Sequence, residues 1–322
     1  MRLAIVGCGA VGGQIARRIP SNTIDQLVLV DHSQADDLAS QLGAYAKSAP
    51  IVPPDVDVVV IASRWGSQTA VARQAIRSGA SVVAVADSME DVRGLLALNV
   101  EAQERGQTIV VGAGFSPGLT GVMALHASTW MSVVDEIHIA KVGTGGPWCA
   151  RQHHRALGNP GLDYRRGAWI PRSGGSGREL SWFPDPVGSH DCYRAAMGDP
   201  LLIAQLFPEA ERVTARMAAT RRDRLTARFP MLVPPHPDGG IGGVRVELRG
   251  WSEGRREIVV LGSAAPPAEA SATVAMAAVH EFVAPTNVQT GSYPLASLID
   301  PQQFLRRLAT QGLHTERFEG AQ

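Results

Sequence analysis

The sequence predicts an α/β protein in two parts, a doubly wound parallel sheet followed by an α+β domain with a mainly antiparallel sheet. Two observations predict the first part: short apolar runs rich in valine and isoleucine, and segments of helical length between them. Uninterrupted apolar strands separated by helices are typical of a parallel sheet that helices cover on both faces. A third observation, the loss of this alternation after Gly114, predicts a second domain with a different architecture.

The first part alternates strands and helices along the chain. Residues such as Pro20 and Gly79 end the helical segments, because proline cannot continue a helix and glycine favours its end. The expected strands are Leu3–Val6, Leu27–Val30, Asp57–Ala62, Ser81–Ala86 and Thr108–Val111, and the expected helices are Ala10–Ile19, Ser67–Ser78 and Met89–Arg105.

The second part is expected to begin with a helix and a strand. Pro117 suits the first position of a helix that runs to about Trp130, and Val133–Lys141 alternates as a strand does. Residues 143–200 are rich in Gly, Pro, Arg, His and Trp and have weak periodicity. A stretch of this kind predicts a long functional loop.

Regular structure is expected to return toward the C-terminus. Gly243–Trp251 and Glu257–Gly262 have the pattern of an antiparallel hairpin, and Glu269–Val283 and Pro301–Gln311 have that of helices. The predicted domains are residues 1–117, to which about residues 285–322 return, and residues 118–284.

The composition favours a small-molecule substrate. Lys and Arg number 30 and Asp and Glu number 30, so no basic field indicates nucleic acid or a membrane surface. The three cysteines contain no C-x-x-C pair, so we expect neither a disulfide framework nor a metal site. The apolar run Leu3–Val6 is too short for a signal peptide, and no run reaches the ~18 residues of a membrane span. We therefore expect a cytoplasmic protein.

A glycine-rich turn follows the first expected strand. Gly7, Gly9 and Gly12 form the pattern G-x-G-x-x-G, with Ala10 and Val11 between the last two. The first glycine permits the tight turn, the second lets a pyrophosphate approach the backbone, and the third allows the helix to pack closely on the strand. The helix N-terminus then offers free N–H groups to the phosphates. The pattern predicts a Rossmann dinucleotide site; a glycine-rich turn without a ligand is the alternative.

Asp31 indicates which dinucleotide would bind. It ends the second expected strand, where a carboxylate can accept hydrogen bonds from both ribose hydroxyls and would repel a 2′-phosphate. We therefore expect NAD, with NADP less favoured. The alternative is that Asp31 serves only as a helix N-cap or turn residue.

Further motifs carry a family resemblance. One expected strand ends in Asp87-Ser88, and another leads into Gly114-Phe115-Ser116-Pro117-Gly118-Leu119; near the C-terminus stand Gly291-Ser292-Tyr293-Pro294 and residues 301–308. This order resembles the saccharopine dehydrogenase-like family of NAD(P)-dependent oxidoreductases. The resemblance covers residues 1–142 well, 285–315 loosely and 143–260 poorly.

The resemblance implies a function and a set of site residues. It implies hydride transfer at a C–N (imine or amine) centre of an amino-acid-derived carboxylate substrate, and a homodimer formed through the second domain. Carried over by position, the residues that would line the cofactor path beyond the glycine turn are Ala62, Ser63, Asp87, Ser88, Gly114, Phe115 and Pro117.

Three residues are candidates for proton transfer. Lys141 ends an expected strand and is one of two lysines in an arginine-rich chain; a lysine removed from water gives up its proton more readily. His153 and His154 are adjacent, so on a strand they would point to opposite faces and at most one would face a site. A solvated lysine and polar loop histidines are the alternatives.

Arg151 and Arg155 are candidates for binding the substrate carboxylate, because a guanidinium can hold a carboxylate with two hydrogen bonds. Two other functions remain open. One is another two-domain Rossmann dehydrogenase of the homoserine, aspartate or sugar oxidoreductase type, although the sugar enzymes would favour Lys-Pro where Asp87-Ser88 stands. The other is a non-catalytic nucleotide-sensing protein, which a cleft without polar groups beside the nicotinamide would favour.

Overall fold

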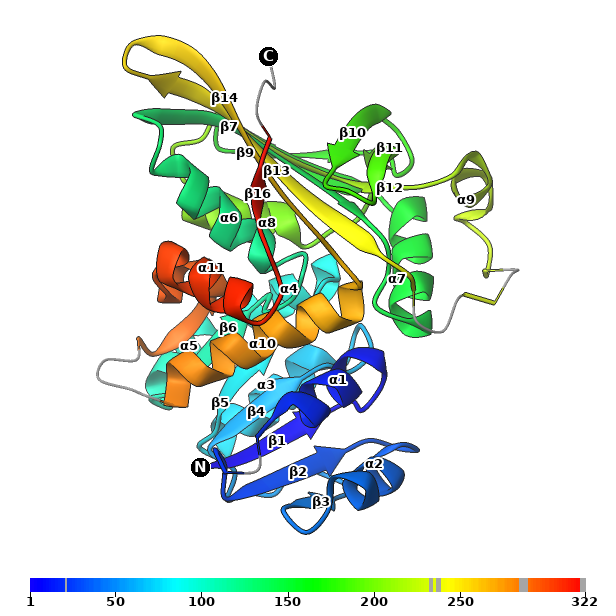
Figure 1. The fold of residues 1–322 in the computed structure, drawn as a ribbon, viewed down its shortest axis with the longest axis vertical. Coiled ribbons are helices and arrows are strands. Elements are labelled where there is room, and N and C mark those ends of the chain that lie inside the picture. The colour runs from blue at the N-terminus through cyan, green and yellow to red at the C-terminus, as the bar shows by residue number, and fades with distance from the viewer. Residues whose placement is uncertain (21, 232–233, 236–238, 284–288, 319–322) are drawn as a thin grey trace.

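The computed structural model describes residues 1–20, 22–231, 234–235, 239–283 and 289–318. Two sheets lie at opposite ends of the long axis of the molecule, and helices fill the space between them (Figure 1). The N-terminal sheet has seven strands in the order β15-β6-β5-β4-β1-β2-β3, all parallel. The two-part α/β architecture predicted from the sequence is thus confirmed.

The first domain is built from strands with fully apolar, buried centres. Residues such as Leu3 and Ile5 are fully buried, since helices cover both faces of the sheet. In chain order its elements are β1 (Arg2–Val6), α1 (Ala10–Arg18), β2 (Gln26–Val30), α2 (Ala35–Leu42), β3 (Ala46–Ser48), β4 (Val58–Ile61), α3 (Gln68–Arg77), β5 (Ser81–Ala84), α4 (Met89–Leu96), α5 (Asn99–Glu104) and β6 (Thr108–Val111).

The strand order reverses at β1, which lies between β2 and β4. Val6 therefore pairs with Val30 on one side and Ile61 on the other. A crevice opens at such a switch point, at the carboxyl ends of the strands, and this is where ligands bind in sheets of this kind. The glycine turn starts there, directly after Val6.

The second domain is built on a mixed sheet whose strands are mostly antiparallel. Its elements and the closing ones are α6 (Leu119–Ser128), β7 (Val133–Val142), α7 (Pro147–Gly158), β8 (Gly161–Arg165), β9 (Ala168–Arg172), β10 (Glu179–Phe183), β11 (Gly188–Arg194), α8 (Asp199–Leu206), β12 (Arg212–Ala218), α9 (Arg221–Thr226), β13 (Gly242–Ser252), β14 (Arg255–Ala265), α10 (Pro267–Val283), β15 (Gly291–Pro294), a 3-10 turn (Leu295–Leu298), α11 (Pro301–Thr310) and β16 (Glu316–Arg317).

The chain crosses between the two sheets near its end. Helix α10 packs along α1 of the first domain, β15 joins the first sheet beside β6, and β16 pairs with β14 in the second sheet. One buried apolar cluster runs from Leu3 of β1 through Val122 of α6 to Val244 of β13. The two domains therefore share a continuous core below the cleft.

Three sequence predictions need correction. Residues 143–200 do not form a loop: they hold α7, four short strands and the start of α8. Their periodicity is weak because polar side chains such as Gln152 and His154 occupy buried positions. The helix expected over Met89–Arg105 is divided into α4 and α5. Pro117 does not begin a helix, since Gly118 has a φ of 135° and α6 starts after it.

Among the described residues, no helix has both the length and the apolar character needed to cross a bilayer.

Candidate active site between the two domains

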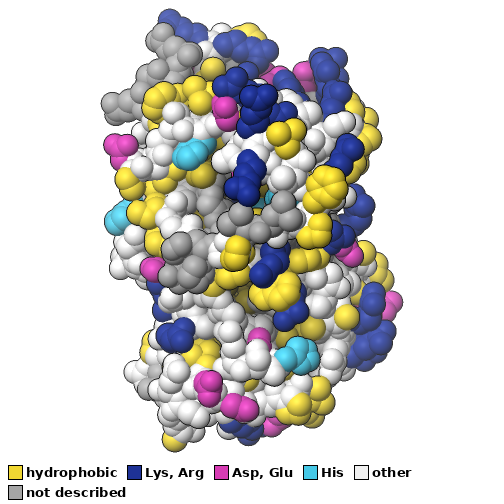
Figure 2. All heavy atoms as spheres, turned by 90° about the vertical axis from the view of Figure 1, so that its right-hand side faces the viewer, with side chains coloured by type: hydrophobic (Ala, Val, Ile, Leu, Met, Phe, Trp, Pro, Cys, Tyr) yellow, Lys and Arg dark blue, Asp and Glu magenta, His cyan; other side chains and the backbone are white. Residues whose placement is uncertain are grey.

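A cleft of about 830 Å³ lies between the two domains. It extends from the glycine turn, at the carboxyl ends of the parallel strands, to helix α7 of the second domain. The face of the molecule on the α7 side is hollowed near its middle, and Lys, Arg and large apolar side chains surround the hollow (Figure 2). Among the predicted site residues, the cleft is lined by Gly7, Gly9, Ala10, Val11, Asp31, Ala62, Ser63, Asp87, Gly114, Phe115, Pro117, Lys141, His153 and Arg155.

The glycine turn fits a pyrophosphate. Gly7 has a φ of 93°, and a Cβ there would lie 2.7 Å from the Ala62 backbone. A Cβ on Gly12 would lie 1.8 Å from the Gly7 carbonyl, so Gly12 allows α1 to pack on the turn and does not line the cleft. At Gly9, by contrast, a Cβ would meet nothing within 4 Å. The open space is therefore at Gly9, where no side chain caps the N-terminus of α1.

Asp31 holds the turn and also faces the cleft. Its carboxylate accepts hydrogen bonds from the backbone N–H groups of Cys8 and Ser33, both at 2.9 Å, and of Gln34 at 3.2 Å. Burial alone would raise the pKa of Asp31, but these hydrogen bonds outweigh it and the pKa lies below its ordinary value. Asp31 is therefore an anion in a turn, and its carboxylate borders the crevice.

The far end of the cleft holds a cluster of four polar side chains, which we call the cleft cluster: Asp87, Lys141, Cys149 and His153. Asp87 follows β5, Lys141 comes from β7, and Cys149 and His153 lie one turn apart on α7. The Oδ2 atom of Asp87 lies 2.9 Å from His153 Nε2, 3.7 Å from Cys149 Sγ and 3.9 Å from Lys141 Nζ. A single carboxylate oxygen is thus shared by an imidazole, a thiol and an ammonium.

Burial sets the charge states of this cluster. Burial is the main reason that the pKa of His153 lies below its ordinary value, and the Lys141 charge lowers it further. Burial and the charge of Asp87 raise the pKa of the Cys149 thiol to about 12. The pKa of Asp87 itself is lowered: burial opposes this, but the His153 hydrogen bond and the Lys141 charge outweigh it. At neutral pH Asp87 is therefore an anion, His153 a neutral imidazole and Cys149 a neutral thiol.

The cluster does not have the geometry of a nucleophilic triad. The Cys149 sulfur lies 3.5 Å from His153 Nε2, the same nitrogen that contacts Asp87. A triad histidine uses its two ring nitrogens for the nucleophile and the acid. Because Asp87 is ionised, Nε2 carries the ring proton and donates a hydrogen bond to Asp87. His153 therefore cannot pass a proton from Cys149 to Asp87 through its ring.

We expected no metal site from the sequence, yet the structure brings three potential donor atoms together. Asp87 Oδ2, Cys149 Sγ and His153 Nε2 all lie within 4.8 Å of one another, a spacing that can hold a cation. In the structure the Lys141 ammonium already provides positive charge at this oxygen. A second contact of Lys141, a hydrogen bond from Nζ to the Ser116 carbonyl at 3.4 Å, ties the cluster to the turn before α6.

Four of the predicted site residues lie outside the cleft. Gly12 packs under the turn, and Ser88 is the buried N-cap of α4, where its hydroxyl accepts from the Asp91 N–H. His154 and Arg151 line a separate hollow of about 550 Å³ on the other side of α7. His154 Nε2 lies 3.0 Å from the Thr226 carbonyl. The two histidines do diverge as expected, but on a helix and not on a strand.

The sequence reasoning missed several residues of the site. Cys149 was not considered as a partner of His153, although their spacing of four residues would have placed them together on a helix. It also missed an aromatic cluster across the cleft mouth: the rings of Trp65 and Trp148 lie 6.0 Å apart, and the Arg64 guanidinium lies 3.8 Å above Trp148. These contacts join the loop after β4 to the start of α7, which no local pattern reveals.

Known proteins resemble the chain in sequence and in fold. It is 31% identical over 148 residues to an L-aspartate dehydrogenase of Methanosarcina mazei, a match that covers 41% of this chain and 52% of that protein. The chain thus matches about half the length of this curated relative. No protein-family model matches the chain.

Solved structures resemble the chain over nearly its whole length. Saccharopine dehydrogenase (L-Glu forming) from Saccharomyces cerevisiae is 15% identical, with a TM-score of 0.72 over 98% of this chain and 99% of that chain. An amine dehydrogenase from Mycobacterium smegmatis is 13% identical, with a TM-score of 0.54 over 93% and 96% of the two chains. The resemblance seen in the sequence motifs is therefore confirmed at the level of the fold: the chain has the two-domain α/β fold of saccharopine dehydrogenase.

Proposed function

We propose that the protein is an NAD(P)-dependent oxidoreductase that transfers hydride at the C–N centre of an amino-acid-derived carboxylate. The observation that carries this proposal is the position of the cleft cluster. It lies at the end of a cleft whose other end is a dinucleotide-type glycine turn, so a bound nicotinamide would reach it. The similar proteins include an L-aspartate dehydrogenase and a saccharopine dehydrogenase, and both names support an amino-acid substrate.

We expect the residues of the cleft to have separate roles in the reaction. The cofactor supplies or accepts the hydride. Lys141 is the candidate group for holding and moving a proton at the substrate nitrogen, because its ammonium stands in the cleft beside Asp87. Arg155, at the cleft wall, is the candidate anchor for the substrate carboxylate. The Trp65–Trp148 contact across the mouth would limit the access of water.

This proposal is tested by turnover measurements. Amino acids are offered with NAD, and 2-oxo acids with ammonia or a second amino acid are offered with NADH, while the absorbance of the reduced cofactor is followed. Aspartate and oxaloacetate come first because of the named relative. Consumption of an amino acid or a 2-oxo acid with an amine supports the proposal. Turnover of sugars or simple hydroxy compounds alone would favour another dehydrogenase type, and NADH binding without any turnover would favour a nucleotide sensor.

The cofactor preference is proposed separately. NADH should bind more tightly than NADPH, because the anionic Asp31 borders the crevice and would repel a 2′-phosphate by roughly 1 kcal/mol, about fivefold in affinity. Fluorescence titration with both cofactors checks this. Asp31→Asn keeps an oxygen for the turn N–H groups and should narrow the difference; tighter binding of NADPH by the unchanged protein would contradict the assignment.

Two further expectations complete the proposal. The family resemblance supports a homodimer formed through the second domain, which light scattering coupled to gel filtration would test. The resemblance to metabolic amino-acid dehydrogenases supports a cytoplasmic location, which cell fractionation would test.

A further inference from the structure

Asp199 is a fully buried carboxylate behind the cleft, in the first turn of α8. Its Oδ1 atom accepts hydrogen bonds from the hydroxyls of Ser116 and Thr120, both at 2.8 Å. Its Oδ2 atom is buried and has no hydrogen-bond partner among the residues that the structure describes. A buried carboxylate with an unpartnered oxygen destabilises a fold, so its presence requires another reason.

The segment around Asp199 holds both first-domain loops that face the end of the cleft. The Gly198 N–H donates to the Asp87 carbonyl at 3.3 Å, and Met197 forms a β-bridge with Ser88. Asp199 itself fixes the Ser116 side chain, and the carbonyl of Ser116 accepts the hydrogen bond of Lys141. Asp199 is thus connected to Lys141 through one residue.

Burial raises the pKa of the Asp199 carboxyl above its ordinary value, although the positive charge of Lys141 and the two hydroxyls act in the opposite direction. Its link to the cleft cluster is the chain of hydrogen bonds through Ser116, which joins Oδ1 of Asp199 to Nζ of Lys141.

We propose that Asp199 is a positioning residue for the reaction: it fixes the Ser116 turn, and through the Ser116 carbonyl it places the Lys141 side chain in the cleft. The inference rests on the proposed function, because it concerns how Lys141 is placed for proton transfer. It gives a reason for a fully buried carboxyl at this place in the fold.

Asp199→Ala tests the inference, because it removes the oxygen that accepts from Ser116 and Thr120. We expect kcat to fall about 10- to 100-fold and NADH affinity to stay within a factor of two, whereas Asp199→Asn, which keeps an accepting oxygen, should retain most of kcat. The matched control is Asp300→Ala. Asp300 is an exposed N-cap of α11 that accepts from the Gln303 N–H at 2.7 Å, and this variant should leave kcat unchanged.

A second measurement needs no substrate. Lys141 and Lys47 are the two lysines of the chain, and Lys47 is exposed. Labelling with an amine-reactive reagent, quantified by peptide mass spectrometry, therefore reports on Lys141 with Lys47 as an internal control. Asp199→Ala should speed the labelling of Lys141 several-fold, because the Ser116 carbonyl would no longer hold its amine, and should leave Lys47 unchanged.

The outcomes are distinct. Unchanged kcat and unchanged labelling of Lys141 in Asp199→Ala would overturn the inference. A lower unfolding temperature together with lost NADH affinity would also overturn it, because Asp199 would then be merely structural. If the unchanged protein turns over no amino acid or 2-oxo acid, the proposed function fails, while the labelling and the unfolding temperature still decide the role of Asp199.

Discussion

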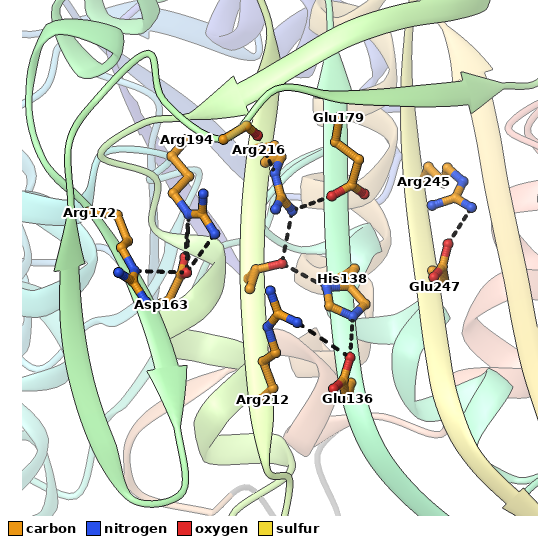
Figure 3. Close-up of polar contacts among 12 residues, drawn as sticks. Glu136, His138, Asp163, Arg172, Glu179, Arg194, Arg212, Arg216, Arg245 and Glu247 are labelled. Atoms are coloured by element: carbon orange, nitrogen blue, oxygen red, sulfur yellow. Dashed lines mark hydrogen bonds and ion pairs between the residues drawn. The ribbon is translucent and has the colours of Figure 1, made fainter. Parts of the chain in front are cut away.

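Two clusters of ionisable groups, the cleft cluster and a network on the second sheet, differ in where their members lie and in what can reach them. The sheet network is drawn in Figure 3. In it, Asp163 meets Arg194 through contacts of 2.9 to 3.1 Å, and His138 contacts Thr214 at 2.8 Å through Nδ1 and Glu136 at 2.9 Å through Nε2. In the cleft cluster, three side chains share one oxygen of Asp87.

The difference indicates what each cluster does. In the sheet network the carboxylates are held by side chains of the sheet, as Asp163 is by Arg194 and Arg172, so removing one member leaves a charge uncompensated and the loss is one of stability. In the cleft cluster the partners of Asp87 line the cleft, where a substrate can replace one of them, so the loss is one of activity. We expect the following four tests of this difference to show effects of decreasing size.

Lys141→Met should have the largest effect. It removes the candidate proton-transfer group, so we expect turnover to fall about 10²- to 10⁴-fold while NADH affinity, measured by fluorescence titration, is retained. Lys47→Met is the control, because Lys47 is the exposed lysine of the chain. Turnover of Lys141→Met equal to that of the unchanged protein would remove Lys141 from the mechanism.

Asp163→Ala should lower the free energy of unfolding and leave kcat unchanged. Asp163 and Arg194 are 7% and 14% exposed, so removal of Asp163 leaves Arg194 buried without its partner. We expect the free energy of unfolding to fall by about 3 kcal/mol, measured by urea denaturation, with kcat of the folded protein unchanged. A loss of kcat without a loss of stability would contradict the division between the two clusters.

Arg155→Ala and Arg151→Ala compare two arginines one turn apart on α7. Arg155 lines both the cleft and the hollow beside His154, whereas Arg151 lines the hollow and not the cleft. Loss of a charge-assisted hydrogen bond to the substrate carboxylate should raise KM about tenfold or more for Arg155→Ala, and less for Arg151→Ala. The reverse order in steady-state kinetics would move the substrate to the hollow beside His154.

His153→Gln should produce the smallest effect, a change in acid stability. The ordinary pKa of histidine is about 6.5, and burial holds the pKa of His153 below that value in the folded protein. The folded state therefore takes up this proton less readily than the unfolded state, and stability falls as the pH drops below about 6.5.

His153→Gln should therefore lose less stability on acidification, by at most about 1.4 kcal/mol per pH unit. Thermal unfolding across this pH range measures the difference. His314→Gln, at an exposed position, is the control and should follow the unchanged protein. If His153→Gln and His314→Gln lose stability in parallel as the pH falls, the fold does not hold His153 neutral.

The sequence determined those features that depend on local pattern. The buried strands of the first sheet carry unbroken apolar runs, so their existence and parallel pairing were predictable, as was the glycine turn after Val6. Hairpin β13–β14 and helix α11 were predictable because their apolar residues follow the period of a strand and of a helix. Lys141 was identified because it ends a strand with a regular alternation.

Which residues meet at the end of the cleft depends on the tertiary fold. Asp87, Lys141 and His153 come from three elements separated by at least twelve residues of sequence each, and partial burial then shifts the pKa values of Asp87 and His153. Helix α7 buries the polar residues Gln152 and His154, which hides its period. Asp199 lies behind the cleft through a contact with Ser116, 83 residues away. Apolar periodicity records which face of an element is buried, but it carries no information about which distant side chains share that buried space.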